Sequence, residues 1–361
     1  MTIRVRHFVP GRLCLLGEHS DWAAEFGRHP GYCLVVGTDQ GLSAVAEPAD
    51  ALLIESPVPD ALGCPSGRSR RMDCRWNAKA LLAAAGDAEE FFRYCAGVAY
   101  QMKTVRRVKG GIRLRITRMD LPLKRGVSSS AAVCILVAKA FNAAYDLRLF
   151  PHELMELAYQ GERVTGSQCG RMDQACIYGR VPVLLTFRKS SAIRVEPVFP
   201  GADISMFFVD LGGKKDTVKI LSDLRAAYPR SKRLQEALGR RNEEFVRAAY
   251  RALSAGEADE LGRIMTEAQR VFDASAAPCS PGELASPLLH QVLSLPEIAP
   301  HIYGGKGVGS QGDGTAQFVA RSPADRRAAI EKIRRALPRM RCFPLTIHRG
   351  ALSGRAQKGH K

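Results

Sequence analysis

The stretch LPLKRGVSSSAAVCILVAKAF, residues 121–141, joins a glycine and three serines to an alanine-rich apolar segment. Apolar residues lie on nearly every face of the expected helix, so we expect a buried helix over 129–147 whose solvent edge is marked by Lys139. Its first turn has free N–H groups and the positive end of the helix dipole. The serines can cap such a helix, and Gly126 permits close approach of the backbone. Alone, the stretch fits a serine-rich cap and a phosphate site equally well, and the GxxxxGK[ST] spacing of a Walker loop is absent.

A second glycine-rich segment, GGKGVGSQGDG, covers residues 304–314. Six glycines in eleven positions cost much conformational entropy. A plain hairpin does not need so many glycines. We therefore expect a loop that forms a second anion cradle or a lid over the first, rather than a flexible turn.

Length and composition indicate a folded protein of two domains. The chain has 361 residues, of which 46% are hydrophobic and 25% charged. It has no run of about 18 apolar residues, so we expect no membrane span. The N-terminal MTIRVRHFV lacks the apolar core of a signal peptide, which predicts a cytoplasmic protein. Ten cysteines without CxxC pairs indicate reduced thiols rather than a zinc site, with Cys64 and Cys74 flanking a Gly/Arg loop.

The net charge of +17 raises the question of a polyanionic partner. The basic runs are dispersed, and aromatic residues, at 7%, do not interleave with them. A basic surface suited to a phosphorylated small substrate is therefore favoured over a nucleic-acid face. Residues 351–361 are expected to form a disordered basic tail. We expect a monomer or a homodimer.

The pattern of apolar residues predicts an α+β protein rather than a doubly wound sheet, because strands and helices do not alternate strictly. A domain boundary is expected near 195, giving domains 1–195 and 196–350. The strands are predicted at 3–9, 31–38, 42–48, 111–118, 182–188, 193–198, 203–210, 315–320 and 342–348. The helices are predicted at 78–104 with a break near Gly86, at 129–147, 151–165 and 323–336, and over 216–272 with breaks near Pro229 and Gly256.

Two polar clusters suggest chemistry. The segment GRLCLLGEHSDW, residues 11–22, places Arg12, Glu18, His19 and Asp21 around a short apolar strand, and such a set can bind several hydroxyls of a polyol. On the helix 151–165, Glu162 shares a face with apolar residues and needs a partner such as a cation. Mg²⁺ held by that carboxylate, a hydroxyl and phosphate oxygens would serve. Asp173 follows a glycine-containing turn, where helix capping alone would explain it.

Together these motifs, in this order, resemble the GHMP kinases, the superfamily of galactokinase, homoserine kinase, mevalonate kinase and phosphomevalonate kinase. GRLCLLGEHSDW resembles the galactokinase signature GRVNLIGEHTDY, and LPLKRGVSSSAA resembles the phosphate-loop motif PxxxGLxSSAA. GGKGVGSQGDG resembles the C-terminal glycine-rich motif, and CGRMDQ, residues 169–174, resembles the galactokinase CGIMDQ. The resemblance covers most of the chain, from Pro10 to about Ala320. It implies an N-terminal domain like ribosomal protein S5 domain 2 and a ferredoxin-like C-terminal domain, with ATP between them.

The resemblance also implies residue roles. Asp173 matches the aspartate that accepts or steers the proton of the substrate hydroxyl, and Arg12 matches the arginine near that hydroxyl. Sugar binding is implied for Glu18, His19, Asp21 and Gly170. ATP binding is implied for Lys124, Gly126, Val127, Ser128, Ser129, Ser130, Ala131 and Phe91, and the glycine-rich C-terminal loop is represented by Gly305, Gly307 and Gly309. Mg²⁺ binding is implied for Ser130 and Glu162.

Departures from the galactokinase pattern leave the substrate open. Trp22 replaces a tyrosine, Phe91 stands where tryptophan is usual, and Lys124 and Arg125 replace small residues. The segment DLGGKKDTVKIL, residues 210–221, does not reproduce the stretch that supplies a sugar-contacting tyrosine. The expected activity is ATP-dependent phosphorylation of a sugar or polyol hydroxyl. The alternatives are a kinase for a non-sugar alcohol such as a mevalonate-like acid, which the 11-residue gap from Glu162 to Asp173 favours, and a non-catalytic sugar- or nucleic-acid-binding regulator.

Overall fold

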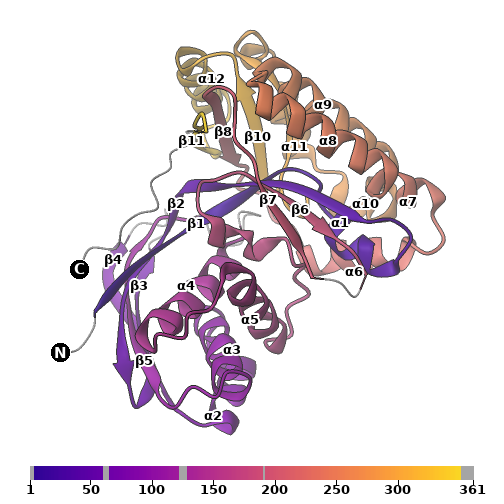
Figure 1. Cartoon of the computed structure of the whole chain (residues 1–361). Helices are drawn as coiled ribbons and strands as arrows, with labels where there is room; N and C mark the ends of the chain where they lie inside the picture. Colours follow the sequence, from indigo (N-terminus) through magenta and orange to yellow (C-terminus); the bar gives the residue numbers. More distant parts are fainter. Residues whose placement is uncertain (1–3, 60–64, 122–127, 190–191, 351–361) are drawn as a thin grey trace.

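The computed structural model describes residues 4–59, 65–121, 128–189 and 192–350. Two sheets divide this part of the chain (Figure 1). The first has seven strands in the order β4-β3-β5-β2-β6-β7, with β1 paired to β2, and only β3 and β5 run parallel. Its strands are β1 Val5–Leu16, β2 Gly31–Ala49, β3 Ala51–Pro59, β4 Pro65–Arg75, β5 Gly111–Met119, β6 Val183–Phe187 and β7 Arg194–Pro197.

The second sheet has the strand order β11-β8-β10-β9, and its neighbouring strands are antiparallel. In chain order the strands and the main helices between them run β-α-β-β-α-β, which is the ferredoxin-like arrangement. This confirms the predicted α+β class and C-terminal fold. The strands are β8 Ile204–Asp210, β9 Ile302–Gly307, β10 Thr315–Ala320 and β11 Arg341–Ile347, and α12 is Pro323–Ala336.

The helix expected after the serines is α4 Ser129–Ala144, and it lies in the core of the first half. Every residue from Ala131 to Ala138 is buried, which explains its apolar sequence. It packs against β1, β2 and the neighbouring helices α3 and α5 (Figure 1). Lys139 is half-buried and donates to the backbone oxygen of Ile177 at 3.3 Å. The other helices here are α2 Ala78–Asp87, α3 Glu90–Thr104 and α5 Pro151–Val164.

The second half contains two long helices, α8 Arg240–Ala255 and α9 Ala258–Ser275. They pack side by side, as Figure 1 shows. The breaks predicted in this helical stretch are confirmed, because α6 Thr217–Ala227 ends before Pro229 and α8 ends at Ala255, where Gly256, with φ of 81°, caps it. The remaining helices are α7 Lys232–Leu238, α10 Pro281–Leu284 and α11 Pro287–Leu293. No helix of the described residues is long and apolar enough to span a membrane.

Several expectations about local structure were wrong, and the strands predicted at 31–38 and 42–48 form the single strand β2. The basic Gly/Arg stretch expected as a loop is β4, the edge strand of the first sheet, paired with β3. Arginines are tolerated there because an edge strand keeps one side in solvent. The glycine-rich segment is not wholly a loop, since Gly304 to Gly307 belong to β9. A Cβ on Gly304 would lie 2.1 Å from the backbone oxygen of Gly262 in α9, so this glycine permits close packing of a helix on a strand.

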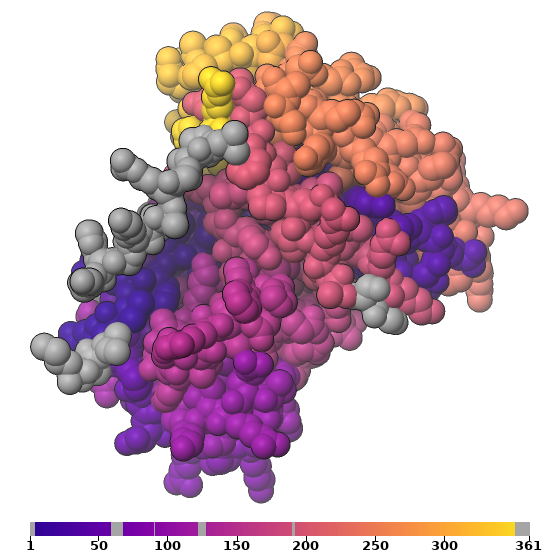
Figure 2. Space-filling view, in the orientation of Figure 1, coloured from indigo at the N-terminus to yellow at the C-terminus, as the bar shows by residue number. Residues whose placement is uncertain are grey.

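The chain leaves the first sheet at Pro197 and enters the second at Ile204. The domain boundary predicted near 195 therefore falls inside β7. The two halves nevertheless share apolar contacts. The short helix α1 Ser20–Ala23 leaves the first half and buries Trp22 among side chains of the second, including Ile220, Leu224 and Tyr228. Figure 2 shows the indigo surface of this N-terminal segment bordered by the salmon and orange surface of the second half. The predicted division into two domains therefore stays a prediction, and the tail 351–361 lies outside the described residues.

Candidate active site

A cavity of about 640 Å³ lies between the two halves of the molecule. It brings together most of the residues that the sequence singled out. They come from the turn after β1, the start of α4, the end of α5, the segment before the short 3-10 helix Asp173–Tyr178, and the glycine-rich loop. The predicted residues that line it are Arg12, His19, Asp21, Ser128, Ser129, Ser130, Glu162, Gly170, Asp173 and Gly309.

The turn after β1 is shaped by backbone that few residues adopt. Gly17 has φ of 109°, and a Cβ there would lie 2.2 Å from the backbone oxygen of Tyr32. His19 has φ of 68°. The register of β1 shifts between Pro10 and Arg12, which is expected where a proline cannot donate to the ladder. These irregularities direct Arg12 and the segment after Gly17 into the cavity.

Asp173 is the centre of a charged cluster. Nη2 of Arg12 and the hydroxyl of Ser128 both donate to its Oδ1, the second at 3.0 Å. Burial opposes the charge on Arg12, but the Asp173 carboxylate outweighs burial and raises the pKa of Arg12 above its usual value. Ser128 has φ of 56° at the start of α4 and makes no capping hydrogen bond. The predicted serine cap is therefore wrong for Ser128, because its hydroxyl turns to Asp173 instead.

Glu162 lies beside this cluster and is 1% exposed. Ser130 donates to its Oε1 at 2.7 Å, and Gln174 donates to its Oε2 at 2.9 Å. Burial and the charge of Asp173 raise the pKa of Glu162 to about 7, although hydrogen bonds from Ser130, Gln174 and Ser167 oppose the shift. The buried carboxylate is thus held by neutral donors rather than by a cationic side chain, and it carries the hard oxygen atoms that Mg²⁺ prefers.

Asp21 and His19 form the wall near the second half. Burial, then the charge of Asp173, raise the pKa of Asp21 to about 6. Gly170 lies against that carboxylate, since a Cβ on Gly170 would lie 1.8 Å from Oδ2 of Asp21. Trp22 donates to Nδ1 of His19 at 3.1 Å, and burial lowers the pKa of His19 to about 3. His19 is therefore neutral, and because its Nδ1 accepts from Trp22, its Nε2 carries the proton and can donate a hydrogen bond to a hydroxyl.

Glu18 does not line this cavity. Its carboxylate forms an ion pair with Lys306 of β9, and both residues are almost wholly buried. Lys306 also donates to the backbone oxygen of Gly307 at 2.7 Å. The pair joins the turn after β1 to the second sheet, which makes Glu18 a structural link between the two halves in this structure.

The remaining predicted residues that the structure describes do not line this cavity. Phe91 is buried beneath Arg70, whose guanidinium lies 4.9 Å from the ring centroid, and it does not line the cavity. Ala131 is buried in α4, while Gly305 and Gly307 lie in β9. Lys124, Gly126 and Val127 lie outside the described residues, as does Cys64. Within the described residues there is no cluster of three His, Cys, Asp or Glu side chains that could hold a metal ion, and the cysteines there are free thiols.

Sequence reasoning missed Lys215 and Ser310, which also line the cavity. Lys215 follows two glycines in the segment 211–216, and that change of composition before α6 was the available signal. Gln174 was quoted within CGRMDQ but received no role, and it holds Glu162.

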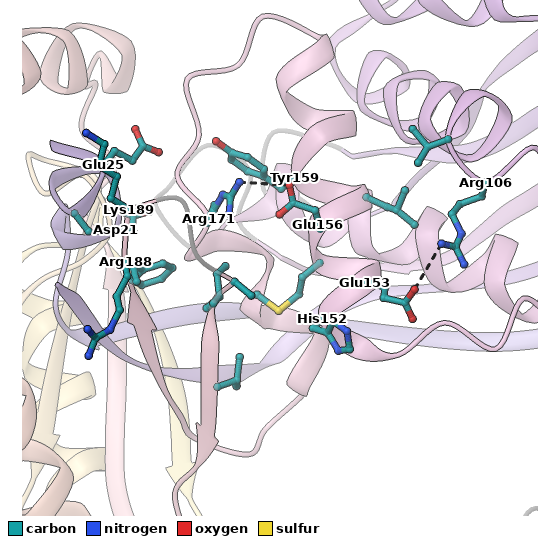
Figure 3. Close-up of a pocket in the computed structure, with 18 residues that line it drawn as sticks. Asp21, Glu25, Arg106, His152, Glu153, Glu156, Tyr159, Arg171, Arg188 and Lys189 are labelled. Carbon is teal, nitrogen blue, oxygen red and sulfur yellow. Dashed lines mark hydrogen bonds and ion pairs between the residues drawn. The ribbon is translucent and has the colours of Figure 1, made fainter. Parts of the chain in front are cut away.

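A second cavity, of about 830 Å³, shares Asp21 with the first. Figure 3 shows the side chains that line it. Its apolar lining includes Met155 and Leu157 of α5, Phe187 at the end of β6, and Ala192, Ile193 and Val195 in and before β7. Two ion pairs cross its rim, Arg106 with Glu153 at 3.6 Å and Arg171 with Glu156 at 3.4 Å. The described residues that line it include equal numbers of carboxylates and of Lys or Arg side chains. The carboxylates are Asp21, Glu25, Glu153 and Glu156, and the cationic side chains are Arg106, Arg171, Arg188 and Lys189.

Comparison with known proteins agrees with this fold. Residues 92–180 match the family described as GHMP kinases N terminal domain. The chain is 26% identical to a galactokinase of Roseiflexus sp. over 202 residues, 54% of this chain and 46% of the relative. It is 24% identical to a galactokinase of Thermococcus kodakarensis over 298 residues, 74% of this chain and 77% of the relative. The matched part thus spans about half the length of the Roseiflexus protein.

Two solved structures are similar over nearly the whole chain. Lactococcus lactis galactokinase complexed with galactose has a TM-score of 0.74 at 16% identity, covering 96% of this chain and 94% of that one. L. major mevalonate kinase in complex with R-mevalonate has a TM-score of 0.72 at 16% identity, covering 97% and 98%. Residues 92–180 therefore match a GHMP kinase N-terminal domain, and the chain is similar in sequence to galactokinases and in fold to a galactokinase and a mevalonate kinase.

Proposed function

We propose that this chain transfers the γ-phosphate of ATP to a hydroxyl of a sugar or sugar-like polyol. The observation that carries the proposal is the Asp173 carboxylate, held by Arg12 and Ser128 in a cavity beside the Ser130–Glu162 pair. A carboxylate fixed by two donors on one oxygen keeps its other oxygen for an acceptor hydroxyl. That is the arrangement expected of a group that orients a nucleophile and receives its proton.

The cavity has two ends with different chemistry. At one end the backbone N–H groups at the N-terminus of α4 provide donors for phosphate oxygens. At the other end Asp21 and His19 provide acceptors and donors for hydroxyls. The acceptor would lie between Asp173 and this second end, with its reacting hydroxyl at Oδ2 of Asp173. Arg12 would stabilise negative charge that develops as the phosphoryl group moves.

Ser130 and Glu162 fit a magnesium ion. One hydroxyl and one carboxylate, 2.7 Å apart, match an ion that keeps several waters and takes its other ligands from nucleotide phosphates. When bound, Mg²⁺ would neutralise charge on the donor phosphates. Gln174 and Ser167 hold the carboxylate in place for that role.

A non-sugar alcohol is the second candidate acceptor. The similarity to mevalonate kinases, in sequence and in structure, favours it. The polar side chains of Asp21 and His19, which can bind hydroxyls, favour a sugar as the acceptor over a non-sugar alcohol.

The test is ADP release with Mg-ATP across free sugars, sugar acids, inositols and mevalonate. We expect one acceptor class to stimulate ADP release and Asp173→Asn to lower that rate by about 100-fold or more. Asp146→Asn is the matched control, because Asp146 is 75% exposed and forms an ion pair with Arg148 at the surface. An ADP release rate that no acceptor raises above the ATP-only background would contradict the proposal.

A further inference from the structure

Helix α6 has two apolar faces, and packing within the molecule accounts for one of them. Ile220 and Leu224 are fully buried in the cluster that contains Trp22. Val218 and Leu221, three residues apart, share a different face of the helix, and both line the cavity between the two halves. Val218 is 60% exposed, so burial in a core does not explain the apolar side chain at this position.

Hydrogen bonds hold the first turn of α6 in place. Asp216 caps the helix by accepting from the N–H of Lys219 at 2.9 Å, and its own N–H donates to Glu283 at 2.8 Å. The hydroxyls of Thr217 and Ser310 are hydrogen-bonded at 3.2 Å, which ties the turn to the glycine-rich loop. These polar groups have partners within the chain. The surface of the helix that is left to contact a ligand in the cavity is therefore mainly apolar.

Contacts of Trp22 place this apolar face at the acceptor end of the cavity. Trp22 lines the cavity, directly follows Asp21 in the chain and donates from its indole N–H to Nδ1 of His19 at 3.1 Å. Arg225, four residues after Leu221 on α6, has its guanidinium 5.4 Å from the centroid of the Trp22 ring. The side of α6 that lines the cavity therefore lies beside Trp22, and Trp22 in turn contacts the wall that can bind hydroxyls.

The acceptor end thus has a polar wall and an apolar wall. A hydroxyl turned toward Val218 and Leu221 would give up hydrogen bonds to water and find no partner on these side chains. A methyl group in the same place would remove apolar surface from water without that loss. Asp21 and His19 remain available for hydroxyls elsewhere on the same acceptor.

We propose that Val218 and Leu221 form a specificity-determining wall and that the acceptor is a deoxy sugar in which a methyl group takes the place of a hydroxymethyl group. The inference rests on the proposed function and narrows its substrate class. The methyl group contacts the wall, while Asp173 receives the proton of the reacting hydroxyl. The methyl group stays unreacted, and the products are ADP and the phosphate ester of the deoxy sugar.

The test compares pairs of sugars that differ by one hydroxyl. The pairs are D-galactose, D-mannose and D-glucose, each with its 6-deoxy form. ADP release with Mg-ATP is measured with wild-type protein, Val218→Thr and Val181→Thr. Threonine keeps the shape of valine and adds a hydroxyl to the wall. Val181 is 46% exposed and lines neither of the two cavities described above, so Val181→Thr is the matched control.

We expect kcat/KM of wild type for one 6-deoxy sugar to exceed that for its parent by about 5- to 30-fold. Val218→Thr should reduce this ratio by about threefold or more, mainly through KM, and Val181→Thr should keep it. A parent sugar that is used as well as its 6-deoxy form in every pair would overturn the inference. So would a preference that Val218→Thr leaves unchanged, because another part of the cavity would then select the methyl group.

Calorimetric titration of the same sugars without nucleotide separates this inference from the proposed function. A 6-deoxy sugar that binds wild type more tightly than Val218→Thr, without any ADP release, would support the apolar wall and contradict the kinase proposal. ADP release with the parent sugars, with no 6-deoxy sugar bound more tightly than its parent, would support the kinase proposal and contradict the role of the wall.

Discussion

At the residue scale, Glu162 is where the structure predicts a clear dependence on pH. Its pKa is about 7 in the folded protein, against 4.5 for an ordinary glutamate, because burial and Asp173 disfavour the charge. The folded state therefore holds a proton that the unfolded state releases between these values. The contribution of this group to stability is present at low pH and is lost as the pH rises through that window.

Glu162→Gln should remove this dependence. Relative to wild type, the free energy of unfolding of the variant should rise between pH 4.5 and pH 8, by at most about 3 kcal/mol for a shift of this size. Chemical denaturation with a metal chelator and without nucleotide measures it. Glu331→Gln, at a side chain that is 53% exposed, should show little change with pH. A difference between Glu162→Gln and wild type that stays constant with pH would show that Glu162 titrates normally.

Single residues were predictable from sequence where a motif carries them. Asp173, Arg12 and Ser128 lie in recognisable motifs, and the structure brings the three together. Glu18 lies in the same motif, but its partner Lys306 is 288 residues away, and no local pattern reveals such a pair. The interaction of Lys215 with the glycine-rich loop is equally non-local.

At the scale of elements, the contact between α3 and α5 depends on two glycines. A Cβ on Gly97 would lie 2.1 Å from the backbone oxygen of Gly161, and a Cβ on Gly161 would lie 2.7 Å from Cα of Val98. The two helix backbones therefore touch with no room for a side chain. This contact holds the end of α5, and with it Glu162, against the core.

Gly161→Ala should destabilise the protein although alanine is the better helix former. Helix propensity favours alanine by about 1 kcal/mol, whereas overpacking a tight contact costs about 1–3 kcal/mol, and here backbone is the obstacle. We expect a net loss of about 1–2 kcal/mol in chemical denaturation. Gly86→Ala in α2 is the control, because nothing lies within 4 Å of the added Cβ, and it should stabilise by up to about 1 kcal/mol. Equal effects of the two substitutions would refute the close contact.

Elements with a strong local pattern were predicted well, and those defined by pairing were not. The helix α4 is apolar on nearly every face because it is buried on nearly every face. The hairpin β3–β4 was missed because β4 is an edge strand, where solvent allows an arginine-rich sequence that resembles a loop. The glycines of β9 serve packing on α9 rather than a loop, which composition alone does not distinguish.

At the scale of the whole molecule, one apolar cluster joins the two sheets, while the other face of the second sheet has a cluster of its own. A continuous cluster of buried side chains extends from β1 and α4 to β8 and α9, including Leu13, Ile135, Met206 and Ile264. Polar contacts add to it, since Gln317 of β10 donates to the backbone oxygen of Cys14 and Asn242 of α8 donates to that of Tyr32. The arrangement of the two sheets came from the family resemblance, because strand order depends on pairing between distant segments.

Because this core is shared, the two predicted domains should unfold together. Scanning calorimetry of the protein without ligands should show one transition, with calorimetric and van't Hoff enthalpies equal. A fragment of residues 1–197 should not fold alone, because it would expose Trp22 and the side of β2 that contacts α8. Two separate transitions would instead support independent domains. The cavity would then lie at an interface between two domains that can move relative to each other.

Mass spectrometry of the acceptor after incubation with Mg-ATP and the protein tests phosphoryl transfer itself. We expect the acceptor to gain the mass of one phosphoryl group. Arg12→Lys should slow its formation by about tenfold or more, because lysine lacks the planar fork of donors, whereas Arg148→Lys, at a side chain that is 83% exposed, should not. Formation of ADP with no phosphorylated acceptor, or an unchanged rate in Arg12→Lys, would contradict phosphoryl transfer at the Arg12–Asp173 pair.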